Sequence, residues 1–190
     1  MPASTFPRTP SARLRGWMAA VAVVAAAGIA WSVQAAERVA LLRYSAPVPA
    51  HWQPHPPSSQ FRLAQFRVPA APGATDGEVV VFHFGAGQGG SAAANIARWS
   101  SQFTGADGLP VQPRVETLRV GGLPATLAEL NGTYARALAG VPAAPRGGQT
   151  LLAAVVEAPE GNVILQLHGD RATVEANRAA FLAMVTGWKP

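Results

Sequence analysis

The chain has 190 residues, of which 49% are apolar and 13% are charged. This composition excludes an intrinsically disordered protein, and the length predicts one folded domain with room for a targeting segment. Because the chain has no cysteine, disulfides, thiolate metal sites and a lipidated cysteine anchor are excluded as well.

Residues 1–35 have the three regions of a secretory signal peptide. Arginines precede an apolar run from Trp17 to Trp31, and the segment contains no acidic residue. Val33-Gln34-Ala35 then offers small residues at the cleavage positions. We therefore expect cleavage near Ala35 and a periplasmic or secreted mature protein. The alternative is an uncleaved inner-membrane anchor with the domain outside, because the apolar run approaches the length that spans a bilayer.

Much of the positive charge belongs to this segment. It holds three of the 15 basic residues and none of the 10 acidic ones, so the mature chain has 12 basic against 10 acidic residues, a net charge of +2. The remaining arginines are scattered along the predicted strands, without the clustering of an electrostatic footprint. We expect no nucleic-acid partner, and no membrane contact except through an uncleaved signal segment.

Residues 36–59 are rich in proline and have no sustained period, which predicts an extended lead-in anchored on the domain by Trp52. His51 and His55 would share one side of a helix and could then bind a metal. The prolines beside them break such a helix, so we predict no metal site here and no cofactor.

Residues 60–190 form the predicted single domain. Apolar and alternating runs predict strands at 61–68 and 78–84 before a helix that follows Ser91. Ile96, Trp99 and Phe103 lie at helical spacing and are expected to point inward. The remaining runs predict strands at 114–120, 124–138, 150–158 and 162–169 and a final amphipathic helix.

This order predicts an α+β fold, a mainly antiparallel sheet flanked by two amphipathic helices, because consecutive strands are joined as hairpins. Pro159-Glu160-Gly161 between the last two strands is a clear hairpin signal. The expected core consists of Phe66, Val80, Phe82, Ile96, Trp99, Leu152, Val155, Ile164, Phe181 and Trp188.

The glycine-rich stretch 85–90 has the spacing G-x-G-x-x-G of a dinucleotide-binding fingerprint. Such a site needs the glycines to open the helix, yet the best N-cap, Ser91, follows the third glycine. Asp107 precedes the next strand instead of ending it. We therefore expect no dinucleotide and interpret the glycines as a flexible connection.

An anion-binding site is the remaining interpretation of this loop. Successive glycine N–H groups beside a helix N-terminus can hold a carboxylate or phosphate, and polar side chains of the next helix would add donors. The candidate ligand-binding residues are Gln88, Gly89, Gly90, Ser91, Asn95 and Arg98.

Signals for catalysis are weak, and we assign no catalytic residue. No G-x-S-x-G nucleophile motif occurs, and no close pair of carboxylates is evident. His83 and His168 lie near predicted strand ends, where packed or hydrogen-bonded histidines are common. A pocket that unites both histidines with a carboxylate would favour an enzyme.

Three stretches carry a resemblance to known proteins: WQPHPPSSQFRLAQFRVP, FGAGQGGSAAANIARW with SSQF, and LHGDRATVEANRAAFLAMVTGW. They resemble a group of exported bacterial proteins of unknown function, and the last stretch resembles the final strand and helix of PsbP/Mog1-like domains. The resemblance implies a helix-flanked antiparallel sheet that acts as a binding or assembly module. We expect a noncatalytic exported protein whose partner is another protein or a small anion, the alternative being a periplasmic hydrolase with an unrecognised site.

Overall fold

The computed structural model describes residues 37–135, 137–138, 141–142 and 144–190, so the expected signal segment and its cleavage site lie outside the described residues. The strands and helices, in chain order, are β1 Arg38–Leu41, β2 Tyr44–Pro47, β3 Gln53–His55, β4 Arg62–Val68, β5 Gly77–His83, α1 Ala92–Ser100, β6 Phe103–Thr104, β7 Arg114–Val120, β8 Leu123–Tyr134, β9 Ala137–Leu138, β10 Val141–Pro142, β11 Arg146–Val156, β12 Val163–Asp170 and α2 Arg171–Thr186.

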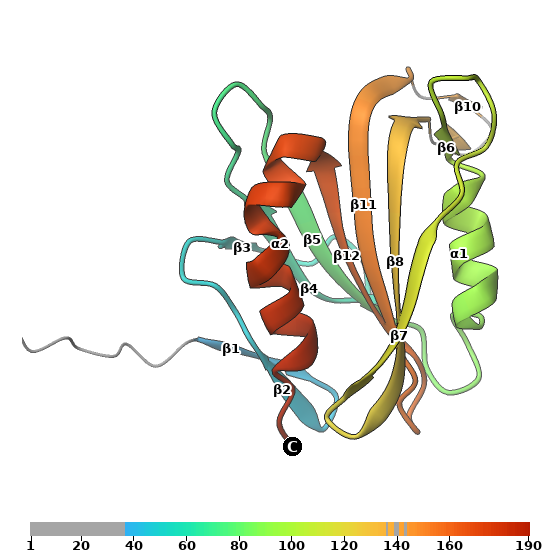
Figure 1. Cartoon of the computed structure of the whole chain (residues 1–190). Coiled ribbons are helices and arrows are strands. Elements are labelled where there is room, and N and C mark those ends of the chain that lie inside the picture. Colours follow the sequence, from blue (N-terminus) through green and yellow to red (C-terminus); the bar gives the residue numbers. More distant parts are fainter. Residues whose placement is uncertain (1–36, 136, 139–140, 143) are drawn as a thin grey trace, which may run out of the picture. The chain divides into compact units, whose positions relative to one another are not determined.

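Eight strands form one sheet in the order β3-β4-β5-β12-β11-β8-β6, with β7 also paired to β8 (Figure 1). Every pairing in this sheet is antiparallel. The hairpins β4–β5, β7–β8 and β11–β12 are those that the sequence predicts. The expected α+β class, with a mainly antiparallel sheet and two helices, is confirmed.

The central strand β11 is buried on both faces. Leu152, Ala154 and Val156 belong to the apolar cluster on one side of the sheet, and Leu151, Ala153 and Val155 belong to the cluster on the other. Side chains alternate between the faces of a strand, so this unbroken apolar run needs cover on both sides.

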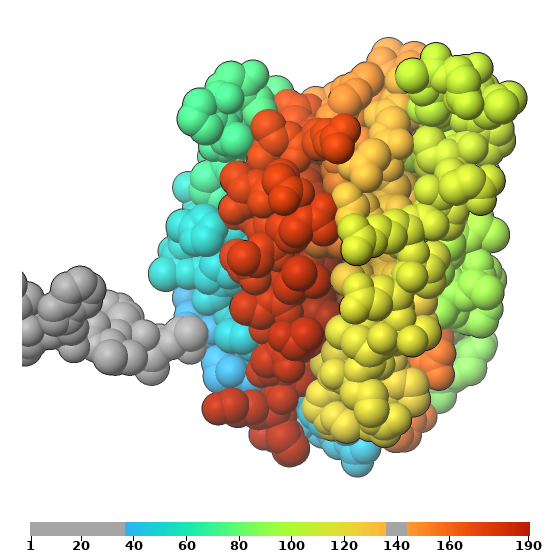
Figure 2. Space-filling model, in the orientation of Figure 1, coloured from blue at the N-terminus to red at the C-terminus, as the bar shows by residue number. Residues whose placement is uncertain are grey.

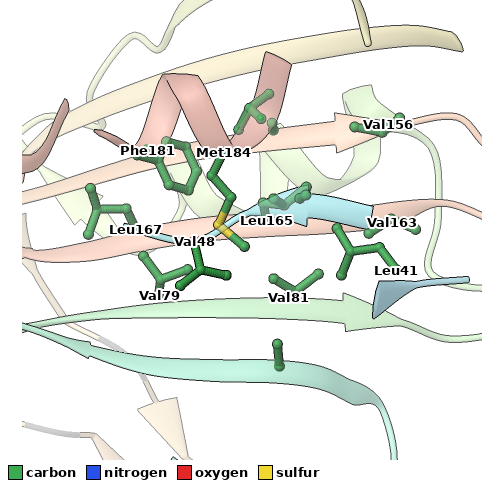
Figure 3. Packing of buried hydrophobic residues seen from close by; sticks show 14 of the residues in the cluster. Leu41, Val48, Val79, Val81, Val156, Val163, Leu165, Leu167, Phe181 and Met184 are labelled. Carbon is green, nitrogen blue, oxygen red and sulfur yellow. The ribbon is translucent and has the colours of Figure 1, made fainter. Parts of the chain in front are cut away.

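Helix α2 covers the first face. It lies in front of the sheet in Figure 1, and Figure 2 shows it between the β4–β5 side and the β7–β8 hairpin. Phe181 and Met184 project from α2 toward Leu165 and Leu167 of β12 and Val79 of β5, as Figure 3 shows, and all five side chains are fully buried. Phe181 is therefore a core residue, as expected.

Residues 37–59, the described part of the expected lead-in, contribute a hairpin and core side chains to the fold. Trp52 is buried, but the β1–β2 hairpin also places Leu41, Tyr44 and Val48 in the α2-side cluster. Backbone hydrogen bonds then join Ser45 to Lys189 beyond α2, at 2.8 and 3.0 Å. Sequence reasoning missed the hairpin because four-residue strands beside prolines give no period to detect.

Helix α1 covers part of the second face. Trp99 and Phe103 pack with Leu130, Leu151 and Ile164 in the second cluster. Phe103 belongs to β6 and not to the helix, because α1 has only nine residues and ends at Ser100.

Eight of the ten expected core residues are buried, and two expectations need correction. Ile96 and Phe82 are half-buried and pack at the margin of the second cluster. Phe82 lines the part of this face that α1 leaves open, whereas Ile96 lies on α1 at the edge of its buried face.

Truncating Phe181 to alanine is expected to lower the free energy of unfolding by about 3–5 kcal/mol, because a fully buried aromatic ring is lost from a packed core. Urea denaturation measures this change. Leu109→Ala is the control, since Leu109 is 62% exposed, and should cost less than about 0.5 kcal/mol. Equal losses in the two variants would contradict the assignment of the core.

Candidate functional site

The glycine-rich loop connects β5 to α1. Gly85, Gly87, Gly89 and Gly90 have φ between 70° and 96°, a region that other residues rarely adopt. At Gly89 a Cβ atom would also come within 2.9 Å of the Phe84 ring. The glycines are therefore needed for the path of the chain.

Ser91 is the N-cap of α1, as predicted, and its hydroxyl accepts a hydrogen bond from the Ala94 N–H at 3.2 Å. Strand β5 pairs antiparallel with both β4 and β12. Among the described residues the glycine loop is thus part of a hairpin sheet and not of the parallel crossover that a dinucleotide fingerprint requires.

Asn95 fastens the loop to the helix. Its side chain is buried, and Nδ2 donates to the carbonyl oxygens of Gly89 at 2.7 Å and Ser91 at 3.0 Å. Its Oδ1 accepts from Arg98 Nη2 at 2.6 Å. Gln88 is exposed nearby. The structure thus brings the six predicted residues together, but the Asn95 amide already has partners within the loop, and anion binding at the loop stays a prediction.

A groove with a cavity volume of about 560 Å³ lies beside α1, on the face of the sheet that α1 leaves partly open. Its floor comes from alternate residues of β5 and β12, paired across the two strands as Phe82 with Ile164, Val80 with Gln166 and Glu78 with His168. Leu151 of β11 completes the floor. The volume falls in the range of small-molecule sites, roughly 300–1,000 Å³.

Two walls enclose the floor. One wall consists of Arg98 and Trp99 of α1, Gln102 of the turn after it and Tyr134 at the end of β8. The opposite wall is the chain leading into β4, with Ser58, Ser59, Phe61 and Arg62, and Phe84 lines the groove next to the glycine loop.

The polar end of the groove holds Glu78 and His168. Glu78 Oε1 accepts from Gln65 Nε2 at 2.6 Å and lies 3.7 Å from Arg62 Nη1. The His168 ring packs on Tyr134, with 4.4 Å between ring centroids, and its Nε2 is buried without a hydrogen-bond partner in the described structure. Burial lowers the pKa of His168 from 6.5 to about 4, helped by the Arg146 charge and opposed by Asp170. His168 is therefore neutral at pH 7.

The aromatic end of the groove is a set of stacked phenylalanines. Phe84 stacks with Phe61 at 5.2 Å and with Phe82 at 6.0 Å between centroids. The Arg62 guanidinium lies over the Phe82 ring, with 5.4 Å from its carbon to the ring centroid. Phe61 is 42% exposed, so this stack has an open apolar side.

The other histidines lie outside the groove. His83 Nε2 is 3.0 Å from the Glu160 carbonyl oxygen, so the structure does not unite His83 with His168. His51 contacts Asn177 Oδ1 at 2.9 Å. Within the described ranges no group of three or more His, Cys, Asp or Glu side chains is placed to hold a metal ion.

Sequence reasoning identified Arg98 but missed the groove. Glu78, Gln166 and His168 come from distant stretches that only the pairing of β5 with β12 brings together. The available signal was the period of two in these strands, which puts each trio of alternate residues on one face.

Across the residues described, no helix has the length and apolar character needed to cross a membrane.

No protein-family model and no curated protein matches the chain, so the resemblance to PsbP/Mog1-like domains is not confirmed. One similar solved structure is PA94 of Pseudomonas aeruginosa, a protein of unknown function, with 17% identity, a TM-score of 0.47, and coverage of 82% of this chain and 96% of that one. Another is LpqN, involved in cell envelope biogenesis of Mycobacterium tuberculosis, with 16% identity, a TM-score of 0.48, and coverage of 83% and 86%. Similarity at this level assigns neither a family nor a function to the chain.

The partly buried His168 makes the fold sensitive to acid. Between pH 6.5 and 4 the unfolded chain gains a proton that the folded protein does not bind, so stability falls as the pH falls through this window. The loss from this group should reach up to about 3 kcal/mol. In His168→Phe, urea denaturation should show a shallower decline from pH 6.5 to 4.

His55→Phe is the matched control, because the His55 side chain is exposed and should leave the wild-type slope in place. Stability that is lost below pH 4 is lost through protonation of carboxylates such as Asp170, whose pKa is lowered by hydrogen bonds from Thr75. A His168→Phe slope identical to that of the wild type would show that His168 does not cause the acid sensitivity.

Proposed function

We propose that the chain is an exported, noncatalytic protein that binds a small ligand in the groove beside α1. The observation that carries the proposal is the groove itself, an apolar floor of Val80, Leu151 and Ile164 ringed by a few polar side chains. Ligand sites in proteins commonly have this composition, since apolar walls bury the ligand and polar groups fix its orientation.

The polar groups of the groove favour binding over catalysis. His168 is the groove histidine, and a base with a pKa of about 4 is weak at neutral pH. Among the described residues, no serine or threonine hydroxyl is hydrogen-bonded to His168 or His83, so the nucleophile–base pair of a hydrolase has no support here. Glu78 is already engaged by Gln65 and Arg62.

Filling the groove should abolish ligand binding. Gln166 is half-buried at the centre of the floor, between Val80 and Ala153 on the neighbouring strands, and a tryptophan there would occupy the cavity. A panel of neutral and charged aromatic and aliphatic compounds, titrated into ¹⁵N-labelled protein, should shift the amide signals of 78–84 and 164–168. Gln166→Trp should lose these shifts.

Gln112→Trp makes the same change at an exposed position outside the groove and should keep the shifts. Urea denaturation of both variants verifies that they fold. If no compound of the panel changes the chemical shifts of the groove amides in the wild type at millimolar concentration, the binding proposal is wrong.

Export is the second part of the proposal and is supported by the signal-peptide pattern of residues 1–35. Protein recovered from the periplasmic or secreted fraction of the native host should have the intact mass of a chain that begins at Ala36. A full-length product that sediments with membranes would instead favour the uncleaved anchor.

A further inference from the structure

We infer that the groove ligand is a planar aromatic anion, whose ring lies at the phenylalanine end and whose anionic group pairs with Arg98. This inference rests on the proposed binding function and specifies its ligand class. The charge of the groove, its stacked rings and the existing partners of its polar side chains support this ligand class.

The groove carries an excess positive charge. It is lined by Arg62, Arg98 and one carboxylate, Glu78, while His168 adds no charge at neutral pH. Arg62 and Glu78 pair with each other at 3.7 Å. One guanidinium, that of Arg98, therefore remains in the groove without a carboxylate.

Arg98 has no anionic partner anywhere in the described chain. All 10 Asp and Glu residues lie in the described ranges, and none of the salt bridges there includes Arg98. Arg98 Nη2 donates a hydrogen bond to the neutral Asn95 Oδ1 at 2.6 Å, which also fixes its position on the wall. A guanidinium offers five N–H donors, so it can bind an anion while it keeps Asn95.

The apolar end is flat, which favours a ring over an acyl chain. The Phe82 and Phe84 rings are nearly parallel, at 8°, and Phe61 continues the stack at 28° to Phe84. Phe61 remains 42% exposed, so a further ring can stack there and remove apolar surface from water. Val80 and Ile164 line the same groove and add apolar surface to it.

Calorimetric titration with three probes tests the inference: 2-naphthoate, the neutral 2-naphthalenemethanol with the same ring system, and decanoate, an acyl anion. We expect 2-naphthoate to bind about tenfold or more tightly than the alcohol, because a charge-assisted hydrogen bond to Arg98 contributes this much. Decanoate should bind more weakly than 2-naphthoate.

Arg98→Gln should weaken 2-naphthoate binding about tenfold or more and change binding of the alcohol by less than about twofold. Arg98→Lys keeps the charge and should retain the preference for the anion. Arg171→Gln, an exposed arginine of α2 outside the groove, is the matched control and should bind all three probes as the wild type does. Urea denaturation verifies that each variant folds.

The outcomes separate this inference from the proposed function. Equal affinities for the naphthoate and the alcohol, with shifts at groove amides, would overturn the anionic ligand and leave groove binding intact. Decanoate binding as tightly as 2-naphthoate would overturn the aromatic ligand. Shifts at Gly89 and Ser91 without shifts at Val80 and Ile164 would assign the anion to the glycine loop, and no binding of either naphthalene compound would count against both proposals.

Discussion

Strands β11 and β12 carry apolar side chains on both faces, and the need to cover both faces organises the rest of the structure. Helix α2, with 16 residues, and the β1–β2 hairpin cover one face. On the other face α1 has only nine residues, which is enough to cover the side of the sheet around β8 and β11. The groove is the part of that face that α1 does not reach, so the candidate site follows directly from the mismatch in helix length.

The glycine loop and the groove depend on each other through α1. Asn95 ties the helix to the loop carbonyls, which fixes where α1 begins, and its Oδ1 also holds Arg98 on the groove wall. The loop thus supports the site by positioning the Arg98 guanidinium. The Arg98 side chain is exposed on this wall and therefore open to a ligand. Burial instead acts on His168, whose lowered pKa keeps it neutral.

The six long strands and the two helices could be predicted in their order along the chain, because hairpin signals such as Pro159-Glu160-Gly161 and the cap at Ser91 are local in sequence. The β1–β2 hairpin could not be predicted, because its stability comes from contacts with Lys189 and α2 at the far end of the chain. The site was predictable only in part. The sequence placed Asn95 and Arg98 in one candidate site, but only the packing of α1 decides that Asn95 turns to the loop while Arg98 lines the groove.

The central claim is that the open part of the α1 face is where a ligand binds. Intermolecular nuclear Overhauser effects between 2-naphthoate and the methyl groups of the protein test this most directly. Contacts to Val80, Leu151 and Ile164 are predicted, because these side chains form the groove floor. A second cavity lies on the α2 side of the sheet and is lined by Val39, Val48 and Leu63. Contacts confined to those three residues would contradict the account.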